Sequence, residues 1–476
     1  MSLLALSGTN SVSGGYDIDN SLKLESDNSE YLKAEGRPAG NQQIWTWSCW
    51  LKRTEVNNGV VAQYMFSAGS DGKLGLYFRD DSSSTGGDTI FIYVDEGNSL
   101  KWIGELRVSF RDTSAWYHIV LAVDSTDGTA ADRTKIYVNG VQQTITFNAT
   151  LNQNVSTRVG DGGGKFSIGA KMDGSYGFNG YMAECVLVDG SALTPTSFGE
   201  YDDDSGIWKP KDVSDLSLGT TGFHMNFDDS SNVGAVQSGT SQGNFDKYNL
   251  SAADQATDTP TNNFCTMNML DRTNGNSKNQ EGATKVTTDG GSGWCSMVAT
   301  MGVTKGKWYW ETQRSGGSSD SNDVVTGIVG SEDAYIPYSS AAQYYIGNVA
   351  TSSSIGFYTT GSPNVRNGDG GSLSNSAGDI IMIGLDMDNS KIYFGINGTW
   401  DALGTGGSSL HADFDGEFVL PAVAVYQGKQ IKINFGGYAS YTISSAASDA
   451  DGYGTFEYAP PSGYYALCTK NLEEYG

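Results

Sequence analysis

Basic residues are scarce in this sequence, which has 29 Lys and Arg against 54 Asp and Glu and a formal net charge of −25. Because an acidic surface repels phosphate groups, we expect no nucleic-acid partner and no attraction to anionic membranes. No apolar run approaches the length of a membrane-spanning helix, so we expect no membrane insertion. The acidic charge itself indicates a well-hydrated surface or, with a suitable cluster, a divalent cation.

Residues for thiolate, disulfide and nucleophile–histidine chemistry are also few. The five cysteines are odd in number and none has Cys-x-x-Cys spacing, so we predict buried free thiols and no zinc site. Of the three histidines, His118 and His224 lie within strand patterns and His411 stands apart, which favours structural roles over general bases. The sequence therefore predicts no catalytic residue. The beginning of the chain has no signal-peptide pattern, so we expect synthesis in a cytoplasm.

The residues that are abundant favour strands and turns. The sequence has 63 glycines and 11% aromatic residues, and Ser, Thr, Asn and Asp separate short apolar runs. Sustained helical periodicity is missing. The segment Trp116–Asp124 has apolar residues on both faces of the predicted strand, as expected of a central strand of a sandwich. Asn139-Gly140 suits a type I′ hairpin turn, and Lys391–Trp400 repeats this device. The sequence thus predicts an all-β protein.

Composition divides the chain into four parts. We predict a β-sandwich over residues 1–228, an extended polar linker over 229–282, a second sandwich over 283–447 and a Gly- and Tyr-rich tail over 448–476. The linker is expected because Asn, Ser, Thr, Gly, Asp and Gln replace the apolar runs there. Both sandwiches should consist of antiparallel strands.

The first sandwich resembles the laminin-G-like, or concanavalin A-like, jelly rolls. Four segments carry this resemblance: Trp45–Arg53 (WTWSCWLKR), Trp116–Asp124 (WYHIVLAVD), Lys135–Gly140 (KIYVNG) and Phe166–Leu193. The second sandwich resembles the SPRY domain, itself a concanavalin A-like sandwich. The segments that carry this second resemblance include Gly306–Glu311 (GKWYWE), Gly378–Asp386 (GDIIMIGLD), Lys391–Trp400 (KIYFGINGTW) and Leu420–Phe435.

The order of the two domains resembles that of virion structural proteins of marine tailed phages. The bridge Leu250–Phe264 and the end segment Pro460–Leu472 are similar to segments of those proteins. This resemblance implies a non-enzymatic protein of the virion, on a tail fibre or knob or as a capsid fibre or decoration. It also implies other virion proteins as partners, a homo-oligomer such as a trimer, and attachment to a glycan or protein of the host surface. A glucanase-like enzyme and a secreted carbohydrate-binding module are the alternatives.

The enzyme alternative depends on Glu25, Asp27 and Glu30. Their spacing matches the ExDxxE motif of one glucanase family with a concanavalin A-like sandwich. Retaining glycosidases need two carboxylates about 5 Å apart, which that family obtains on one regular strand. Here Asp27-Asn28-Ser29 predicts a turn, so we expect a polar hairpin tip with its carboxylates splayed into solvent.

Calcium is the one cofactor that the sequence suggests. Laminin-G-like domains often hold calcium at a sandwich edge, and Asp124, Asp127 and Asp132 lie together before a strand. Calcium requires six to eight oxygen ligands, and these residues match no EF-hand loop. A hydrated loop is the alternative interpretation.

Ligand binding by either sandwich should use aromatic residues in loops beside hydrogen-bonding groups. In the first sandwich the candidates are Tyr176, Phe178 and Asn179. In the second they are Tyr335, Tyr338, Tyr344, Tyr345, Trp400 and Asp401. SPRY domains bind peptides through such loops, so sugar and protein ligands fit equally well, and simple packing is a further alternative.

Overall fold

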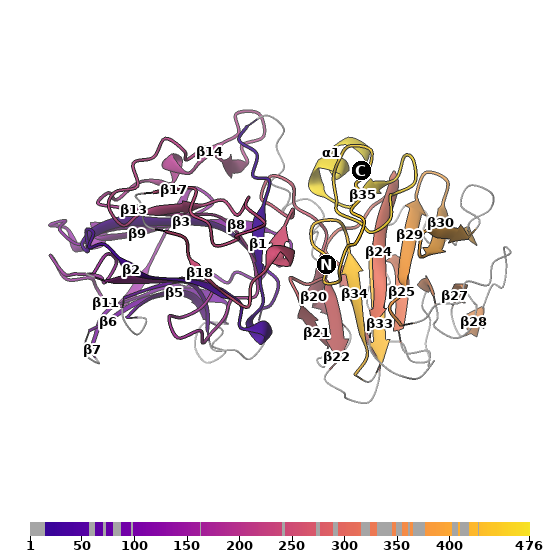
Figure 1. The fold of residues 1–476 in the computed structure, drawn as a ribbon, viewed down its shortest axis with the longest axis horizontal. Coiled ribbons are helices and arrows are strands. Elements are labelled where there is room, and N and C mark those ends of the chain that lie inside the picture. Colours follow the sequence, from indigo (N-terminus) through magenta and orange to yellow (C-terminus); the bar gives the residue numbers. More distant parts are fainter. Residues whose placement is uncertain are drawn as a thin grey trace. The chain divides into compact units, whose positions relative to one another are not determined.

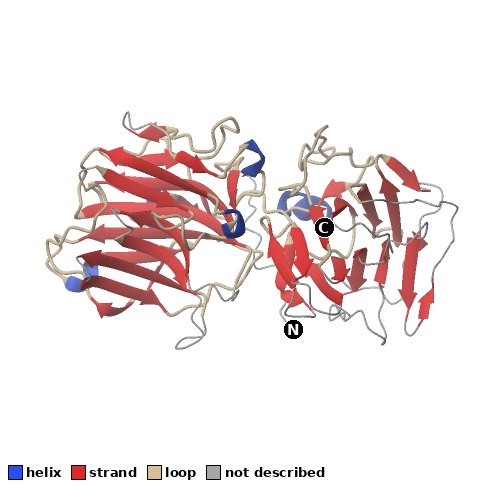
Figure 2. Ribbon diagram, turned by 60° about the horizontal axis from the view of Figure 1, so that its bottom comes forward, coloured by secondary structure: helices blue, strands red, loops and turns tan. Residues whose placement is uncertain are grey.

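A computed structural model describes the chain from residue 15 to residue 476 with internal gaps. The gaps are residues 57–61, 70–72, 80–86, 97–98, 162, 240–242, 273–276, 289–293, 316–323, 331–344, 349–354, 360–361, 365–376, 402–407, 410–417 and 427. The described residues form two compact units, the first ending at Thr261 and the second extending from Asn262 to Gly476. The regular secondary structure of both is almost entirely strand, as Figure 2 shows. No helix in the described parts is long and apolar enough to cross a membrane.

The first unit is a sandwich of a nine-stranded and an eight-stranded sheet, which form the two layers at the indigo and magenta end of Figure 1. The nine-stranded sheet contains β1 (Ser21–Leu24), β3 (Ile44–Arg53), β8 (Trp116–Asp124), β9 (Thr134–Val138), β10 (Val141–Gln143), β13 (Gly180–Asp189), β16 (Phe223–Met225), β17 (Ser238–Gly239) and β19 (Gln255–Ala256). The eight-stranded sheet contains β2 (Tyr31–Arg37), β4 (Ala62–Ala68), β5 (Leu74–Arg79), β6 (Thr89–Glu96), β7 (Ser99–Leu106), β11 (Thr146–Ala149), β12 (Gly164–Ile168) and β18 (Asp246–Tyr248).

Short elements complete the first unit. Two strands, β14 (Gly199–Tyr201) and β15 (Trp208–Pro210), pair with each other. The 3₁₀ turns among the described residues of this unit are η1 (Ser26–Asn28), η3 (Ala130–Asp132), η4 (Pro195–Ser197) and η5 (Ala252–Asp254). The predicted type I′ hairpin after β9 is present, because Asn139 and Gly140 both have positive φ, at 46° and 80°.

The second unit is a sandwich of a seven-stranded and a nine-stranded sheet. The seven-stranded sheet contains β20 (Met267–Arg272), β23 (Trp294–Ala299), β25 (Val324–Gly330), β26 (Tyr345–Asn348), β27 (Ile355–Thr359), β28 (Ser362–Asn364) and β33 (Val419–Tyr426). The nine-stranded sheet contains β21 (Ser277–Gln280), β22 (Lys285–Thr288), β24 (Lys307–Ser315), β29 (Ile380–Asp386), β30 (Lys391–Ile396), β31 (Thr399–Asp401), β32 (Ser408–Ser409), β34 (Gln430–Asn434) and β35 (Tyr465–Ala466). One α-helix, α1 (Thr469–Tyr475), follows.

Strand β8 shows why a central strand of the first sandwich is apolar on both faces. Its residues Ile119, Leu121 and Val123 belong to the core between the two sheets. The alternate residues Val120 and Ala122 lie on the other face, where a second cluster with Phe198, Val213 and Leu218 buries them. The central strands of the nine-stranded sheet are therefore covered on both faces, which explains why β13 is buried along its whole length and β3 from Trp45 to Arg53.

Residues 229–282 differ from the polar linker that their composition suggested. Three short strands of this segment extend sheets of the first sandwich: β17 pairs with β16, β18 with β2 and β19 with β1. From Asn262 onward the segment belongs to the second sandwich, where β20 pairs with β23 and β21 with β22. A polar sequence suffices for these strands because edge pairing uses backbone hydrogen bonds, and turns such as η5 are closed by a capping box between Ser251 and Asp254.

Residues 448–476 likewise form part of the second sandwich, although a tail was expected. Strand β35 pairs in parallel with β24, and Phe456, Ala466 and Cys468 are buried. The carboxylate of Glu311, on β24, holds this segment in place. It accepts hydrogen bonds from the hydroxyls of Tyr309 at 2.9 Å and Tyr441 at 2.8 Å. It also accepts the backbone N–H groups of Glu457 at 3.0 Å and Tyr458 at 2.8 Å.

We expect Glu311→Ala to release residues 455–476 from the second sandwich. The side chain is fully buried and accepts from five donors, the four above and the amide of Asn434 at 3.4 Å, so its loss should lower the free energy of unfolding by at least about 3 kcal/mol. Hydrogen exchange followed by mass spectrometry should show faster exchange at residues 455–458. The exposed Glu473→Ala is the matched control and should leave exchange unchanged; equal exchange in Glu311→Ala would show that the carboxylate is dispensable.

Candidate functional site

The three carboxylates of the ExDxxE motif do not share one strand. Glu25 lies just after β1 as the N-cap of η1, and η1 then turns the chain so that Glu30 lies just before β2. The predicted turn is confirmed, and Ser29 closes it with a positive φ of 55°. Asp27 is exposed as expected, but Glu25 and Glu30 are buried, which corrects the expectation that all three point into solvent.

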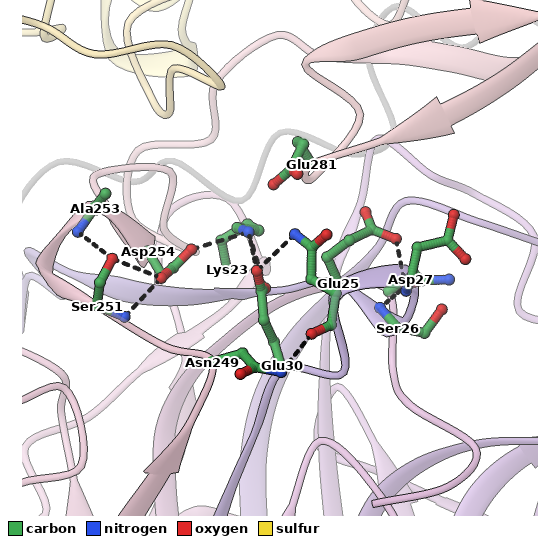
Figure 3. Close-up of polar contacts among 12 residues, drawn as sticks. Lys23, Glu25, Ser26, Asp27, Glu30, Asn249, Ser251, Ala253, Asp254 and Glu281 are labelled. Atoms are coloured by element: carbon green, nitrogen blue, oxygen red, sulfur yellow. Dashed lines mark hydrogen bonds and ion pairs between the residues drawn. The ribbon is translucent and has the colours of Figure 1, made fainter.

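Ion pairing explains the burial of Glu30. Its carboxylate lies 2.8 Å from Lys23 Nζ, and the same ammonium group lies 2.9 Å from Asp254, as Figure 3 shows. Burial raises the pKa of Glu30 above its usual value, while the charge of Lys23 acts in the opposite direction. Asp254 also accepts the N–H of Ser251 as part of its capping box. This cluster therefore anchors the 251–254 turn to β1, and its carboxylates are engaged in structural contacts.

His118 is held in a form that cannot activate its serine neighbour. The indole N–H of Trp208 donates to His118 Nδ1 at 3.0 Å, so the ring proton lies on Nε2. Nε2 in turn donates to Ser48 Oγ at 2.8 Å. Burial lowers the pKa of His118 to about 3, and its ring stacks on Trp50 at 4.6 Å. The structural interpretation of His118 is confirmed. His224 Nε2 lies 2.6 Å from a buried carboxylate, Glu184, and His411 lies outside the described residues.

The three aspartates suggested for calcium are not gathered into one ligand set. Asp124 accepts hydrogen bonds from the backbone and hydroxyl of Thr126, and Asp127 accepts the N–H of Thr129. Asp132 forms an ion pair with Lys135 at 3.1 Å. Among the residues that the structure describes, no group of three or more His, Cys, Asp or Glu side chains is placed to hold a metal ion. The carboxylates here stabilise their own loop.

The loop Lys171–Asn179 separates the roles of its three predicted binding residues. Phe178 is fully buried in the core of the first sandwich. Asn179 is also buried, where it accepts the N–H of Ser26 at 2.6 Å and donates to Glu55 at 2.6 Å. Only Tyr176 presents its ring to solvent, with 46% of its surface exposed and a positive φ of 57°.

Tyr176 belongs to a group of tyrosines on the outward side of the eight-stranded sheet. Its ring stacks on Tyr64 of β4 at 5.9 Å, and Tyr64 stacks on Tyr77 of β5 at 4.7 Å. Tyr93 of β6 meets Tyr77 edge-on at 5.9 Å, and Tyr64 Oη donates to Tyr93 Oη at 3.2 Å. We call Tyr64, Tyr77, Tyr93 and Tyr176 the tyrosine face. Tyr64 is buried, Tyr77 and Tyr93 are half-buried and Tyr176 is exposed, so the cluster is partly open to solvent.

The alternation of β5 creates this face. Leu74, Leu76 and Phe78 point into the core, so Gly75 and Tyr77 point away from it. Glycine is needed at position 75 for a steric reason. A methyl group there would overlap the rings of Tyr64 and Tyr93, which lie over its backbone. The signal that sequence reasoning missed is large aromatics at the polar positions of β4, β5 and β6, where an exposed face normally carries small or charged side chains.

The electrostatics of the tyrosine face are those of neutral hydroxyl groups. Burial raises the pKa of Tyr64 and Tyr93 above the usual range and raises that of Tyr77 to about 12. All three phenols are therefore protonated at neutral pH and can both donate and accept hydrogen bonds. The guanidinium of Arg79 lies over the neighbouring Phe91 ring at 4.5 Å. The face can stack on an apolar ring surface and bond to hydroxyl groups.

In the second sandwich, the predicted loop residues are only partly described. Tyr335, Tyr338 and Tyr344 lie outside the described residues, Tyr345 begins β26 and Asp401 ends β31. Trp400 is half-buried and packs 6.1 Å from Tyr309 in a cluster with Phe456 and Tyr464. That contact gives Trp400 a packing role at the surface of the sandwich.

Comparisons with protein families match each unit to a known domain. Residues 26–197 match the concanavalin A-like lectin/glucanases superfamily, and residues 307–438 match the SPRY domain. The expected order of a laminin-G-like domain followed by a SPRY domain is confirmed, as is the all-β fold. The chain thus carries a sandwich of the lectin type and a SPRY-type sandwich. A search of curated proteins gave no significant match.

Several solved structures are similar to parts of the chain. The SPRY domain of human HERC1 has 21% identity, covering 35% of this chain and 96% of that domain with a TM-score of 0.28. A heptameric SAP-like pentraxin from Limulus polyphemus has 17% identity, covering 38% and 80% with a TM-score of 0.29. A protein from Bacteroides ovatus ATCC 8483, assigned to carbohydrate binding, has 18% identity, covering 49% and 58% with a TM-score of 0.34. Structural similarity at these identities and TM-scores carries no argument about ligands.

We expect the stability of the first sandwich to fall as the pH falls through the range set by His118. Its pKa is lowered in the folded state from 6.5 to about 3, so the unfolded chain takes up the proton first. The stabilisation is complete above pH 6.5 and is lost progressively below it, by roughly 1 kcal/mol per pH unit. Urea unfolding measured at several pH values should show this slope.

The matched variant for this measurement is His118→Gln. Its amide can accept from Trp208 and donate to Ser48 without a titratable ring, so the slope between pH 6.5 and the carboxylate range should flatten. An unchanged slope would contradict the assignment of this pH dependence to His118.

Proposed function

We propose that the protein is a non-enzymatic glycan-binding protein and that its tyrosine face makes the principal contact. The observation that supports this most directly is the cluster of four tyrosine rings on one side of a sheet, in which Tyr176 is exposed and Tyr77 and Tyr93 are half-buried. Sugar rings offer apolar C–H faces between hydroxyl groups, so a site of rings and neutral hydrogen-bonding groups suits them. The match of this unit to a lectin and glucanase superfamily supports the same ligand class.

A catalytic role receives less support from the described residues. A retaining glycosidase needs a pair of carboxylates about 5 Å apart that a sugar can reach. Glu30 is instead bound to Lys23, and Glu25 is buried at the start of η1, where it accepts the N–H of Asp27. Binding without cleavage is therefore the function that we infer for the first sandwich.

We also propose that the protein is exposed on the virion of a tailed phage, on its tail or capsid, and mediates attachment to the host surface. The support is the resemblance in domain order, together with the bridge Leu250–Phe264 and the segment Pro460–Leu472. A homo-oligomer, such as a trimer, would present several tyrosine faces at once, and multivalency would turn weak single contacts into firm attachment. The second sandwich would then contact a protein, either another virion component or a host receptor.

We expect the full chain to bind neutral polysaccharides on a glycan array, and Tyr77→Ala and Tyr93→Ala each to weaken that binding about tenfold, since each removes a stacking ring. Tyr201→Ala is the matched control, because Tyr201 is 49% exposed and packs on Trp208, away from the tyrosine face. Unchanged binding by both tyrosine-face variants would contradict the proposal. Release of reducing ends from the bound glycan, abolished by Glu25→Gln, would favour the glucanase alternative.

We expect cryo-electron microscopy of a phage that carries this protein to show it on the particle surface. Density at the tail tip with the first sandwich outward would support attachment through the tyrosine face. Density on the capsid shell would support a decoration role, with the second sandwich as the candidate for the shell contact. Absence from the particle would overturn the virion proposal and leave glycan binding to be judged by the array alone.

A further inference from the structure

A cavity of about 330 Å³ lies at one end of the first sandwich, where its two sheets part. Strand β10 is the edge of the nine-stranded sheet and β11 is the edge of the eight-stranded sheet, and the connection between them crosses this opening. We call the cavity the mouth; its principal lining residues are Thr134, Gln142, Gln143, Thr144, Ile145 and Phe147. It lies on different strands from the tyrosine face, which is built on β4, β5, β6 and the Lys171–Asn179 loop.

The lining of the mouth combines an apolar floor with uncharged polar groups. Ile145 and Phe147 are half-buried and pack against the core of the sandwich. Gln142 and Thr144 are exposed at the rim, and the amide of Gln143 is held there because it donates to the carbonyl of Val141 at 3.0 Å. None of the described residues that line the cavity carries a charge, although the whole chain has a net charge of −25.

Thr134 supplies the observation that points to a ligand. Its side chain faces between the sheets, two residues before the core residue Ile136, and only 4% of its surface is exposed. Its hydroxyl has no hydrogen-bond partner within the protein. A buried unpaired hydroxyl costs about 1–3 kcal/mol, so a threonine is a poor choice at this position for stability alone. A ligand hydroxyl in the mouth would provide the missing partner.

We propose that the mouth binds one uncharged sugar unit, such as the end of a neutral glycan chain. The volume is at the lower limit of small-molecule sites, which suits a single ring and not an extended oligosaccharide. The apolar floor would contact the C–H face of the ring, while Thr134 and the amides of Gln142 and Gln143 would bond to its hydroxyls. A charged sugar would find no opposite charge among the lining residues and would lose hydration on entry.

The test is a titration of the full chain by saturation-transfer-difference NMR with methyl glycosides of glucose, galactose and mannose, and with methyl glucuronide as the charged probe. At least one neutral glycoside should bind, and Thr134→Val and Gln142→Ala should each weaken it about fivefold, because each removes one neutral hydrogen bond. Thr134→Val keeps the shape of the side chain and removes the unpaired hydroxyl, so the midpoint of urea unfolding should stay the same or rise.

Two matched controls separate the mouth from its surroundings. Thr146→Val makes the same change on β11, at a residue that does not line the cavity, and should leave glycoside binding unchanged. Tyr77→Ala should weaken binding on the glycan array and leave glycoside binding at the mouth intact. The proposal is overturned if no neutral glycoside binds, if Thr134→Val binds as well as the wild type, if the glucuronide binds as tightly, or if Tyr77→Ala alone abolishes glycoside binding.

Discussion

Strand β3 buries large side chains on both of its faces, and the architecture of the first sandwich follows from the need to cover them. Trp45 and Trp47 fill the core between the sheets, while Trp50 points to the opposite side and stacks on His118. A sheet with two apolar faces requires a second layer of protein. The segment between β13 and β16 supplies it, and the hydrogen bond from Trp208 to His118 fixes that segment over the strand.

This double covering makes the two sheets unequal. In the nine-stranded sheet the outer face of the central strands is covered, because Val120, Val186 and Val188 are buried in one cluster with Phe198 and Leu218. The eight-stranded sheet keeps half-buried rings on its outward side, at Tyr77 and Tyr93. One sheet is thus covered by its own chain, and the other leaves tyrosine rings partly open to solvent, where Gly75 allows the rings to lie close to the backbone.

Much of this fold could be predicted from local patterns in the sequence. The alternation in Trp45–Leu51, the two apolar faces of β8 and the Asn139-Gly140 turn each depend on residues that are close along the chain. The exposed ring of Tyr176 was also predicted from its glycine-rich loop. Its partners were not, because Tyr64, Tyr77 and Tyr93 become neighbours only through the register of three strands, which includes a bulge after Tyr64.

The carboxylates of Glu25 and Glu30 show the same limit of prediction from local sequence. The turn after Glu25 follows from the local sequence Asp27-Asn28-Ser29. The burial of Glu30 depends on Lys23 and on Asp254, and Asp254 lies in a segment whose polar composition resembles a linker. Polar segments of this kind pair through their backbones at sheet edges, as β18 does with β2, and hydrophobic patterning gives no indication of such pairing.

The distribution of charge connects the architecture with recognition. The buried carboxylates described above serve the fold: Glu30 and Asp254 share one lysine, and Glu311 satisfies the donors that hold the last residues of the second sandwich. The tyrosine face and the mouth present rings, hydroxyls and amides instead. A neutral sugar exchanges hydrogen bonds with water for hydrogen bonds with such groups and pays no penalty for burying an ion. We therefore expect the net charge of −25 to repel anionic polymers, whereas an uncharged glycan would meet no electrostatic barrier at the two proposed sites.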